Sequence, residues 1–320
     1  MCHRYGPPEV LHIEELASPP VGDGQVRVRV RAASVNYPDV LLMADEYQIT
    51  VPTPFVPGSE FAGTVEEVGR RVEGLFVGQR VMGTVLAGAF AEEAVVSASG
   101  LTPVPPGIDD RSAAAFGVAH RTAYHVLRSI ASLQPGEELV VLGAGGGVGL
   151  AAVQIGVVLG ATVTAVASSA EKLEVAAAMG ATRLVDHRSG DLRQALRVAR
   201  PDGADVVIDP VGGDLAEPAL RSLSYGGRFV TVGYASGVIP RIPLNLVLLK
   251  GVHILGFQFV DFATHAPDER LRNDAELIDL LASGQVRPHI GASFELARVA
   301  EALRYVADGR AIGKVVLDIA

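Results

Sequence analysis

The sequence predicts an α/β fold in two parts: a doubly wound parallel sheet in the middle of the chain and an α+β domain that uses both chain ends. From about residue 112 the chain is rich in alanine and alternates helical stretches with β-branched runs. This order is typical of a parallel sheet covered by helices. The predicted strands lie at 139–143, 162–167, 183–186, 204–209 and 228–233, with a further strand at 252–256.

The first hundred residues have a different texture, because proline and glycine separate short valine-containing runs. Such regular turn residues are typical of a compact antiparallel sheet, with strands predicted here at 26–32, 61–68, 80–83 and 91–96. The segment 51–58 contains three prolines and is predicted to be an ordered loop. Helices predicted at 273–283 and 296–308 and a strand at 313–318 return to an α+β texture. We therefore expect the tail to fold back onto the first domain.

The glycine-rich turn after the first strand of the parallel sheet predicts a dinucleotide site. The run from Val140 to Gly149 reads as strand, tight turn and helix. A pyrophosphate needs free backbone N–H groups at a helix N-terminus and no side chains where it approaches. The residues expected to line this approach are Gly146, Gly147, Val148 and Gly149, with Ala144 at the first position of the fingerprint. A glycine-rich turn with a purely structural role is the alternative.

The end of the second strand, 162–167, bears on the choice of cofactor. An acidic residue there would bond the ribose 2′-hydroxyl and repel a 2′-phosphate. The chain has Ser168, Ser169 and Lys172 instead, two hydroxyls and one ammonium that suit a phosphate. This pattern favours NADPH over NADH. The alternative is that a serine only caps the helix 170–179 and that Lys172 is a solvated charge.

Composition excludes several classes of protein. The 320 residues carry 27 basic and 36 acidic side chains, which argues against binding to nucleic acid. The densest basic stretch, 187–200, is interpreted chiefly as a solvated helix face. Cys2 is the single cysteine, which agrees with a reducing compartment and excludes a four-thiolate zinc site. Glycines interrupt the charge-free span 139–170, so no membrane helix is expected. The first residues lack signal-peptide features, and we expect a cytoplasmic location.

Several separated motifs together resemble one family over nearly the whole chain. They are GPPEVL at 6–11, ASVNYPD at 33–39, PGSEFAG at 57–63, TAY at 122–124, AGGGVG at 144–149 and IGKVVL at 312–317. In this order they resemble the zinc-free quinone oxidoreductase branch of the medium-chain dehydrogenase/reductase superfamily. The resemblance implies a GroES-like catalytic domain over 1–117 and 261–320 and a dinucleotide-binding Rossmann domain over 118–260. It also implies a homodimer, for which the charge-free strand region 252–259 is the expected contact.

The resemblance also bears on metal chemistry. Zinc-dependent members of the superfamily have cysteine, histidine and cysteine where this chain has Asn36, Ser59 and Val118. An amide and a hydroxyl are poor zinc ligands beside thiolate and imidazole, and valine cannot ligate at all. We therefore expect no catalytic zinc, which disfavours alcohol oxidation.

By resemblance, three residues are expected at the reacting groups. Asn36 would lie near the nicotinamide and the substrate carbonyl, Thr122 would touch the carboxamide, and Tyr47 would border the substrate pocket. Alternatively, Asn36 is a turn residue that bonds its own backbone, Thr122 ties a helix turn, and Tyr47 is a half-buried loop aromatic. Leu41 stands where some relatives have a tyrosine, which weakens any transfer of substrate preference.

The resemblance places further residues around the cofactor. His187, at the end of the third strand, would lie beside the adenosine phosphate, or it is a surface histidine. Backbone groups at the end of the fifth strand and in the following turn are expected near the nicotinamide. The residues concerned are Gly233, Tyr234, Leu255 and Phe257, and Lys314 completes the expected cofactor-binding set.

Together these patterns predict an NADPH-dependent reductase that delivers hydride to a quinone or an activated enone. Positioning of donor and acceptor is its main task, and no strong general acid is visible among the matched residues. One alternative is an enoyl-thioester reductase, for which Arg121, Arg241 and Arg270 are candidate phosphate ligands. The other is an NADPH-binding protein with a non-catalytic role.

Overall fold

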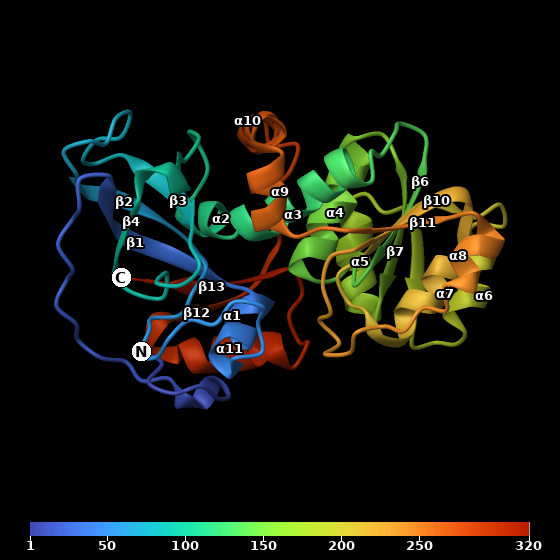
Figure 1. The fold of residues 1–320 in the computed structure, drawn as a ribbon, viewed down its shortest axis with the longest axis horizontal. Helices are drawn as coiled ribbons and strands as arrows, with labels where there is room; N and C mark the ends of the chain where they lie inside the picture. Colours follow the sequence, from blue (N-terminus) through green and yellow to red (C-terminus); the bar gives the residue numbers. More distant parts are fainter. Residues whose placement is uncertain (320) are drawn as a thin grey trace. The chain divides into compact units, whose positions relative to one another are not determined.

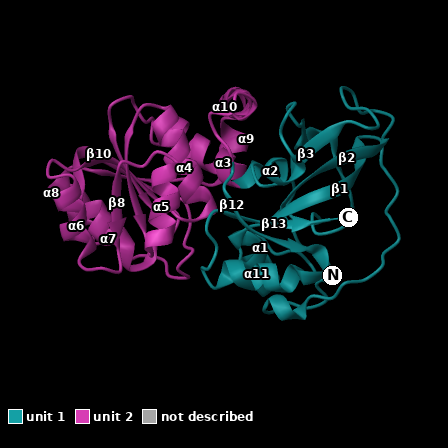
Figure 2. Cartoon of the chain, turned by 180° about the vertical axis from the view of Figure 1, so that it is seen from behind, with its two compact units in different colours: residues 1–118, 288–320 teal, residues 119–287 magenta. Residues whose placement is uncertain are grey.

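The computed structural model describes residues 1–319, which form two compact units (Figure 2). Unit 1 comprises Met1–Val118 and the segment from Pro288 onward, and unit 2 comprises Ala119–Arg287. The boundary between 287 and 288 differs from the predicted one at 260, so 261–287 lie with the central part of the chain. Side chains explain this, because Asp274 and Glu276 bind Arg121 and Tyr124 of unit 2.

Unit 1 is built on a seven-stranded sheet. Its strands are β1 (Gln25–Val35), β2 (Glu60–Val68), β3 (Arg80–Thr84), β4 (Glu93–Ser97), β5 (Leu101–Pro103), β12 (Ile290–Glu295) and β13 (Lys314–Asp318). The strand order is β12-β13-β1-β2-β3-β5, with β4 also paired to β1. Three helices belong to this unit: α1 (Tyr37–Ala44), α2 (Asp110–Ala114) and α11 (Val299–Ala307). A fourth, α3 (Gly117–His125), runs across the boundary into unit 2.

Alternation along β1 decides which face of the sheet is buried. Val26, Val28 and Val30 point into the core, whereas Arg27 and Arg29 point outward and pair with glutamates. This period of two is the pattern expected of a half-buried strand. The tail strand β13 pairs antiparallel with β1, which confirms that the last residues return to the first domain. The helix predicted at 273–283 does not follow them, because α10 (Pro267–Ala282) lies in unit 2.

Unit 2 holds a parallel six-stranded sheet in the order β11-β10-β9-β6-β7-β8, which confirms the predicted doubly wound fold (Figure 1). Its strands are β6 (Glu138–Leu142), β7 (Thr162–Ala167), β8 (Arg183–Asp186), β9 (Ala204–Asp209), β10 (Leu223–Thr231) and β11 (His253–Gly256). Its helices are α4 (Gly147–Val158), α5 (Ala170–Ala178), α6 (Leu192–Ala199), α7 (Ala216–Arg221), α8 (Asn245–Lys250), α9 (Phe259–His265) and α10. Because helices pack on its faces, its central strands are apolar on both sides.

Short helical turns complete the described chain. They are η1 (Pro8–Val10), η2 (Ala98–Gly100), η4 (Gly213–Leu215), η5 (Leu296–Arg298) and the π-helical turn η3 (Val126–Ile130). Each unit has its own apolar core, around Val28, Phe61 and Leu317 in unit 1 and around Val140, Val207 and Phe229 in unit 2. Among residues 1–319, no helix is both long and apolar enough to cross a membrane.

Candidate functional site

The glycine turn between β6 and α4 has the form of a phosphate cradle. A side chain at Gly149 would collide with the carbonyl oxygen of Gly143, so the turn requires glycine at that position. Gly146 is the N-cap of α4 and donates its N–H to the Gly143 oxygen at 2.9 Å. The first turn of α4, which includes Gly147, Val148 and Gly149, has N–H groups without intrahelical partners, as at any helix start. This backbone suits an anion such as a pyrophosphate.

Lys172 lies directly against this turn. A side chain at Gly145 would overlap the aliphatic part of Lys172, so the glycine makes room for the lysine. The Nζ atom lies 3.4 Å from the Ser168 hydroxyl, and burial, followed by the charge of Arg188, lowers the pKa of Lys172. Ser169 caps α5, because its hydroxyl accepts the Lys172 N–H at 3.4 Å. Capping of α5 explains the presence of Ser169. Ser168 and Lys172 remain as the candidate phosphate ligands beside the glycine turn.

A second cation completes this basic cluster, and the sequence interpretation missed it. Arg188 follows β8, and α6 begins only at Leu192, so Arg188 is not part of the solvated helix face proposed for 187–200. The pKa of His187 is lowered, first by burial and then by the Arg188 charge. The sequence feature that could have identified Arg188 is its position, because it is a basic residue that closely follows the third strand of the parallel sheet, β8.

His187 is one of the residues that line an open groove of about 1080 Å³. The groove is lined by residues of the β8–α6 loop and the first turn of α6, of the segment 213–221 and of the loop after β10, including Arg193, Arg221 and Arg241. The groove therefore lies at the carboxyl ends of the parallel strands, where open α/β sheets bind ligands.

Asp209, at the end of β9, is a further residue that the sequence interpretation missed. Its Oδ1 accepts the N–H groups of Val211 and Gly212 at 2.9 and 2.8 Å. This loop packs against the glycine turn, because a side chain at Gly143 would collide with Val211. Asp209 thus fixes the chain next to the cradle. Burial raises its pKa, and the two N–H donors oppose that shift.

The predicted residues near the nicotinamide lie close to strand ends, with two corrections. β10 ends at Thr231, so Gly233 and Tyr234 follow the strand and do not end it. Leu255 is inside β11 and not in a turn. Phe257 follows β11, and its ring stacks on His125 with 6.3 Å between ring centres. Thr122 is half-buried on α3, one turn before His125.

In unit 1, Asn36 is the hub of a buried polar network. Its Nδ2 donates to Glu60 Oε1 at 2.9 Å and to Ser59 Oγ at 3.2 Å. Its Oδ1 accepts from Lys314 Nζ at 2.5 Å. The side chain is therefore engaged with other side chains rather than with its own turn alone. The resemblance predicts Lys314 as a cofactor contact, whereas both hydrogen bonds described for its side chain go to this network.

Lys314 and Glu60 form a buried ion pair at the centre of the network. Their Nζ and Oε1 atoms are 2.6 Å apart, and the residues are only 4% and 1% exposed. Glu60 Oε2 accepts the backbone N–H of Val118 at 2.8 Å. Each charge thus has a charged partner and further hydrogen bonds, the condition under which a buried pair is tolerated.

The same network brings together the three positions that hold zinc in other members of the superfamily. Asn36 bonds directly to Ser59, and Val118 reaches Asn36 through Glu60. Within residues 1–319, no group of three or more His, Cys, Asp or Glu side chains is arranged to hold a metal ion. The donor types at 36, 59 and 118 also do not suit zinc.

Tyr47 and Asp39 lie beside this network. Burial is the main cause that raises the pKa of Tyr47, and the charge of Asp39 adds to it. Asp39 Oδ2 accepts the backbone N–H of Asn36 at 2.7 Å, which fixes the start of α1. Tyr47 itself lies in the loop after α1 and is half-buried.

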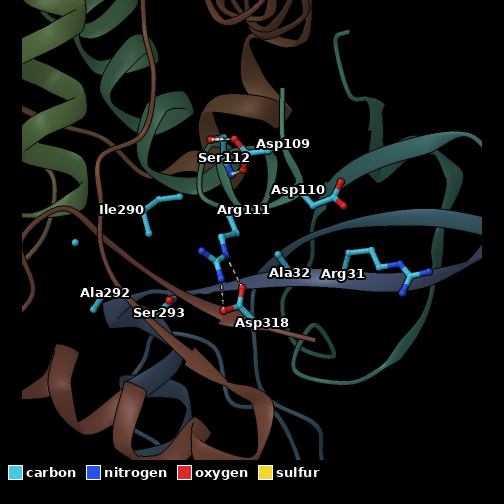
Figure 3. A pocket seen from close by; sticks show the side chains of 11 residues that line it. Arg31, Ala32, Asp109, Asp110, Arg111, Ser112, Ile290, Ala292, Ser293 and Asp318 are labelled. Carbon is cyan, nitrogen blue, oxygen red and sulfur yellow. Dashed lines mark hydrogen bonds and ion pairs between the residues drawn. The ribbon is translucent and has the colours of Figure 1, made fainter. Parts of the chain in front are cut away.

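A separate groove of unit 1, of about 950 Å³, lies beside α2 (Figure 3). Arg111 makes two hydrogen bonds to the Asp318 carboxylate at 2.6 and 2.7 Å, and Ser112 bonds Asp109. None of the network residues around Asn36 lines this groove. We assign it no part in the site.

The fold and these two clusters define a two-domain dinucleotide-dependent oxidoreductase, and comparison with known proteins gives its family. Residues 22–106 match the family "Alcohol dehydrogenase GroES-like domain" and residues 147–278 match "Zinc-binding dehydrogenase". The chain is 37% identical to quinone oxidoreductase-like protein 2 of Bos taurus, over 97% of this chain and 89% of the relative. The chain belongs to the zinc-independent, quinone oxidoreductase-like branch of the medium-chain dehydrogenase/reductase superfamily.

Solved structures agree with this assignment. The quinone oxidoreductase of Escherichia coli complexed with NADPH superposes with a TM-score of 0.90 and 27% identity, over 99% of this chain and 98% of the other. The CurK enoyl reductase superposes with a TM-score of 0.89 and 26% identity, over 99% and 97%. The family is thus dinucleotide-binding and oxidoreductive, and it includes relatives named for two kinds of acceptor.

Proposed function

We propose that the protein is an NADPH-dependent reductase that transfers hydride to a quinone or an activated enone without zinc. The observation that carries the cofactor choice is the cluster of Lys172 and Arg188 beside the glycine turn, with Ser168 and no acidic residue at the end of β7. Two cations and a hydroxyl suit the additional phosphate that distinguishes NADPH from NADH. The NADPH complex of the similar Escherichia coli enzyme supports the same choice.

In this proposal the chain's residues hold and orient the reactants. The N-terminus of α4 and the loop that Asp209 holds in place bind the pyrophosphate. Lys172 and Arg188 bind the 2′-phosphate, and His187 contacts the adenosine end. Thr122, Gly233, Tyr234, Leu255 and Phe257 border the nicotinamide. NADPH, when bound, supplies the hydride that reduces the acceptor. The Asn36 network and Tyr47 orient the acceptor carbonyl and stabilise the charge that develops on its oxygen.

An enoyl-thioester reductase is the second candidate, favoured by the similarity to the CurK enoyl reductase. A coenzyme A or carrier substrate would need basic residues for its phosphate. Two of the three predicted candidates are engaged elsewhere, because Arg121 and Arg270 both pair with Asp274 at 2.8 Å. Arg241 lines the groove at His187. This engagement favours the quinone or enone over the thioester.

Steady-state kinetics test the proposed function. With NADPH as donor, we expect turnover of a simple quinone and of a small enone, because both accept hydride without a metal. A short enoyl-CoA should be a poor substrate. Turnover of the thioester alone would replace the assignment with the second candidate. Tight NADPH binding, measured by fluorescence titration, with no turnover of any of the three would indicate a non-catalytic role.

We also propose a homodimer formed through unit 2. β11 is the last strand of the parallel sheet, and in the described chain it pairs only with β10. Ile254 of this strand is exposed, and so are Leu248 and Leu249 on the neighbouring α8. An open strand edge beside an exposed apolar surface suits pairing with the same edge of a second copy across a two-fold axis.

Light scattering tests this assembly. At micromolar concentration we expect a mass twice the 33.4 kDa of one chain. Ile254→Asp should shift the protein to the monomer, because it places a charge on the paired edge. Ile13→Asp, an equivalent change at an exposed residue of unit 1, should leave the dimer intact. A monomeric wild-type protein under these conditions would contradict the proposal.

A further inference from the structure

Hydride transfer requires the donor and acceptor carbons to be held at a fixed separation of about 3–3.5 Å. In the proposed function, Asn36 orients the acceptor and Thr122 borders the nicotinamide. These two residues lie on different segments of the chain, Asn36 just before α1 and Thr122 on α3. The buried Glu60 carboxylate makes hydrogen bonds to both segments.

Glu60 is held rigidly by the sheet of unit 1. It is the first residue of β2, where it pairs with Ser34 on β1 and with Thr84 on β3. A strand that is paired on both sides positions a side chain more precisely than a loop does. The residue is only 1% exposed, so solvent has almost no access to its carboxylate. Glu60 is therefore suited to act as a fixed point.

One carboxylate oxygen of Glu60 fixes the Asn36 amide. Oε1 accepts hydrogen bonds from Asn36 Nδ2 at 2.9 Å and from Lys314 Nζ at 2.6 Å. The same Nζ donates to Asn36 Oδ1 at 2.5 Å. An Asn36 amide turned by half a rotation would set its NH2 group against the lysine ammonium, where neither group can accept a hydrogen bond. The arrangement therefore allows one orientation of Asn36.

The other carboxylate oxygen fixes the start of α3. Oε2 accepts the Val118 N–H at 2.8 Å, in the first turn of the helix, where N–H groups lack intrahelical partners. Gly117 permits this approach, because a side chain there would overlap Thr84 and lie 3.4 Å from Glu60 Oε2. Thr122 follows Val118 by four positions, about one helical turn. The bond to Val118 thus bears on where Thr122 is placed.

We infer that Glu60 is a positioning residue that sets the distance between hydride donor and acceptor, with Oε1 holding Asn36 and Oε2 holding the helix of Thr122. The inference rests on the proposed function and adds to it the group that aligns the two reactants. Glu60 itself touches neither reactant and transfers no proton. Lys314 balances the buried charge that both bonds require.

The inference predicts a loss in the hydride transfer step and not in cofactor binding. A displacement of about 1 Å at the reacting atoms can slow a reaction about 100-fold. The groups proposed to bind the phosphates, Lys172, Arg188 and the N-terminus of α4, make no described hydrogen bond to Glu60. The affinity for NADPH should therefore change little when Glu60 is altered.

Glu60→Gln tests the link to α3. The glutamine amide has one oxygen, and the Lys314 ammonium requires that oxygen on its own side, so the NH2 group faces the Val118 N–H. In stopped-flow single turnovers, with equimolar NADPH bound and a saturating simple quinone, we expect the rate constant to fall about 100-fold. The Kd for NADPH, measured by fluorescence titration, should stay within about twofold.

The same experiment separates positioning from a purely structural role. Partial unfolding would lower the amplitude of the single turnover and leave the rate constant of the remaining active molecules unchanged. Glu138→Gln is the matched control, because Glu138 is another buried carboxylate, paired with Arg183 at 2.6 Å. It lies at the start of β6, at the opposite end of the strand from the glycine turn. This variant should lose stability and keep the rate constant.

Glu60→Gln combined with Lys314→Met separates the lost link from the unpaired lysine. The double variant has no charge at either position, but its amide still has one oxygen and cannot hold both Asn36 and Val118. We expect the single-turnover rate constant to stay low. A return to the wild-type rate constant would attribute the loss in Glu60→Gln to the buried ammonium and would contradict the inference.

Hydrogen exchange of the protein without NADPH gives a readout that does not depend on turnover. The Glu60 carboxylate protects the Val118 N–H, so amides in the first turn of α3 should exchange faster in Glu60→Gln than in the wild type. Glu138→Gln should leave their exchange unchanged. Equal exchange in Glu60→Gln and the wild type would show that Glu60 does not hold α3.

The outcomes distinguish this inference from the proposed function. If the wild type turns over a quinone or an enone and Glu60→Gln keeps its rate constant, the inference is wrong and the function stands. If the rate constant falls and the exchange of α3 increases, both are supported. If the wild type turns over no acceptor, the proposed function fails and the inference fails with it, whatever the exchange of α3.

Discussion

Lys314→Met is expected to lower the free energy of unfolding by about 3–5 kcal/mol, the range for removal of one partner of a buried ion pair. The substitution would leave the Glu60 carboxylate charged and buried, with only Asn36 and the Val118 N–H as hydrogen-bond donors. The carboxylate loses its only charged partner among the residues described, at a site where Glu60 is only 1% exposed. Urea unfolding at neutral pH measures the effect.

Two further variants show whether the lost charge pairing is responsible. Arg111→Met removes an ion pair with Asp318 that has two hydrogen bonds, but the two side chains are 54% and 34% exposed, so we expect a cost below about 1 kcal/mol (Figure 3). Glu60→Gln combined with Lys314→Met removes both buried charges and should recover part of the loss. A double variant no more stable than Lys314→Met would attribute the loss to packing of the lysine side chain.

The parts of the fold that depend on local sequence were predictable. The strand, glycine turn and helix from Glu138 to Val158 are set by glycines and β-branched residues that are close in the chain, and the structure reproduces them. The strand of the tail was also predictable, because β13 is an apolar run that only a buried sheet position can accommodate. Its pairing with β1 then follows from the return of the chain to the first domain.

The second domain boundary was not predictable from local pattern. α10 has the same amphipathic character wherever it packs, and its position is set by specific pairs between Arg121 and Asp274 and between Tyr124 and Glu276. These partners are more than 150 positions apart in the chain. A periodic pattern shows that a helix has a buried face, but it does not identify the surface that covers that face.

The candidate site shows the same division. Ser168 and Lys172 could be recognised because they follow a strand and a glycine turn that are close in sequence. The network around Asn36 joins segments near residues 36, 60 and 314, and neither Glu60 nor Asp39 has a sequence pattern that marks it as buried. Arg188 was hidden by a wrong helix start, since the arginines at 193, 197 and 200 suggested one continuous helical face beginning before it.

Lys172→Ala is expected to raise KM for NADPH by roughly 10- to 150-fold, which corresponds to about 1.5–3 kcal/mol for a lost hydrogen bond between charged groups. KM for NADH should change less than twofold, because NADH has no 2′-phosphate. Arg188→Ala should show the same selectivity, since the charges of Lys172 and Arg188 act on the same small region beside the glycine turn. Initial rates with a saturating quinone measure both constants.

The ratio of the two KM changes separates phosphate recognition from a structural role of the lysine. Because the aliphatic part of Lys172 packs against Gly145, a purely structural loss would disturb the glycine turn and weaken both cofactors equally. Lys172→Met keeps most of that packing and removes the charge, so it should reproduce the NADPH effect and leave NADH unchanged. Arg197→Ala removes a positive charge from the exposed face of α6 and should change neither constant. Equal losses for NADPH and NADH in Lys172→Met would mean that the preference for NADPH comes from residues other than this cluster.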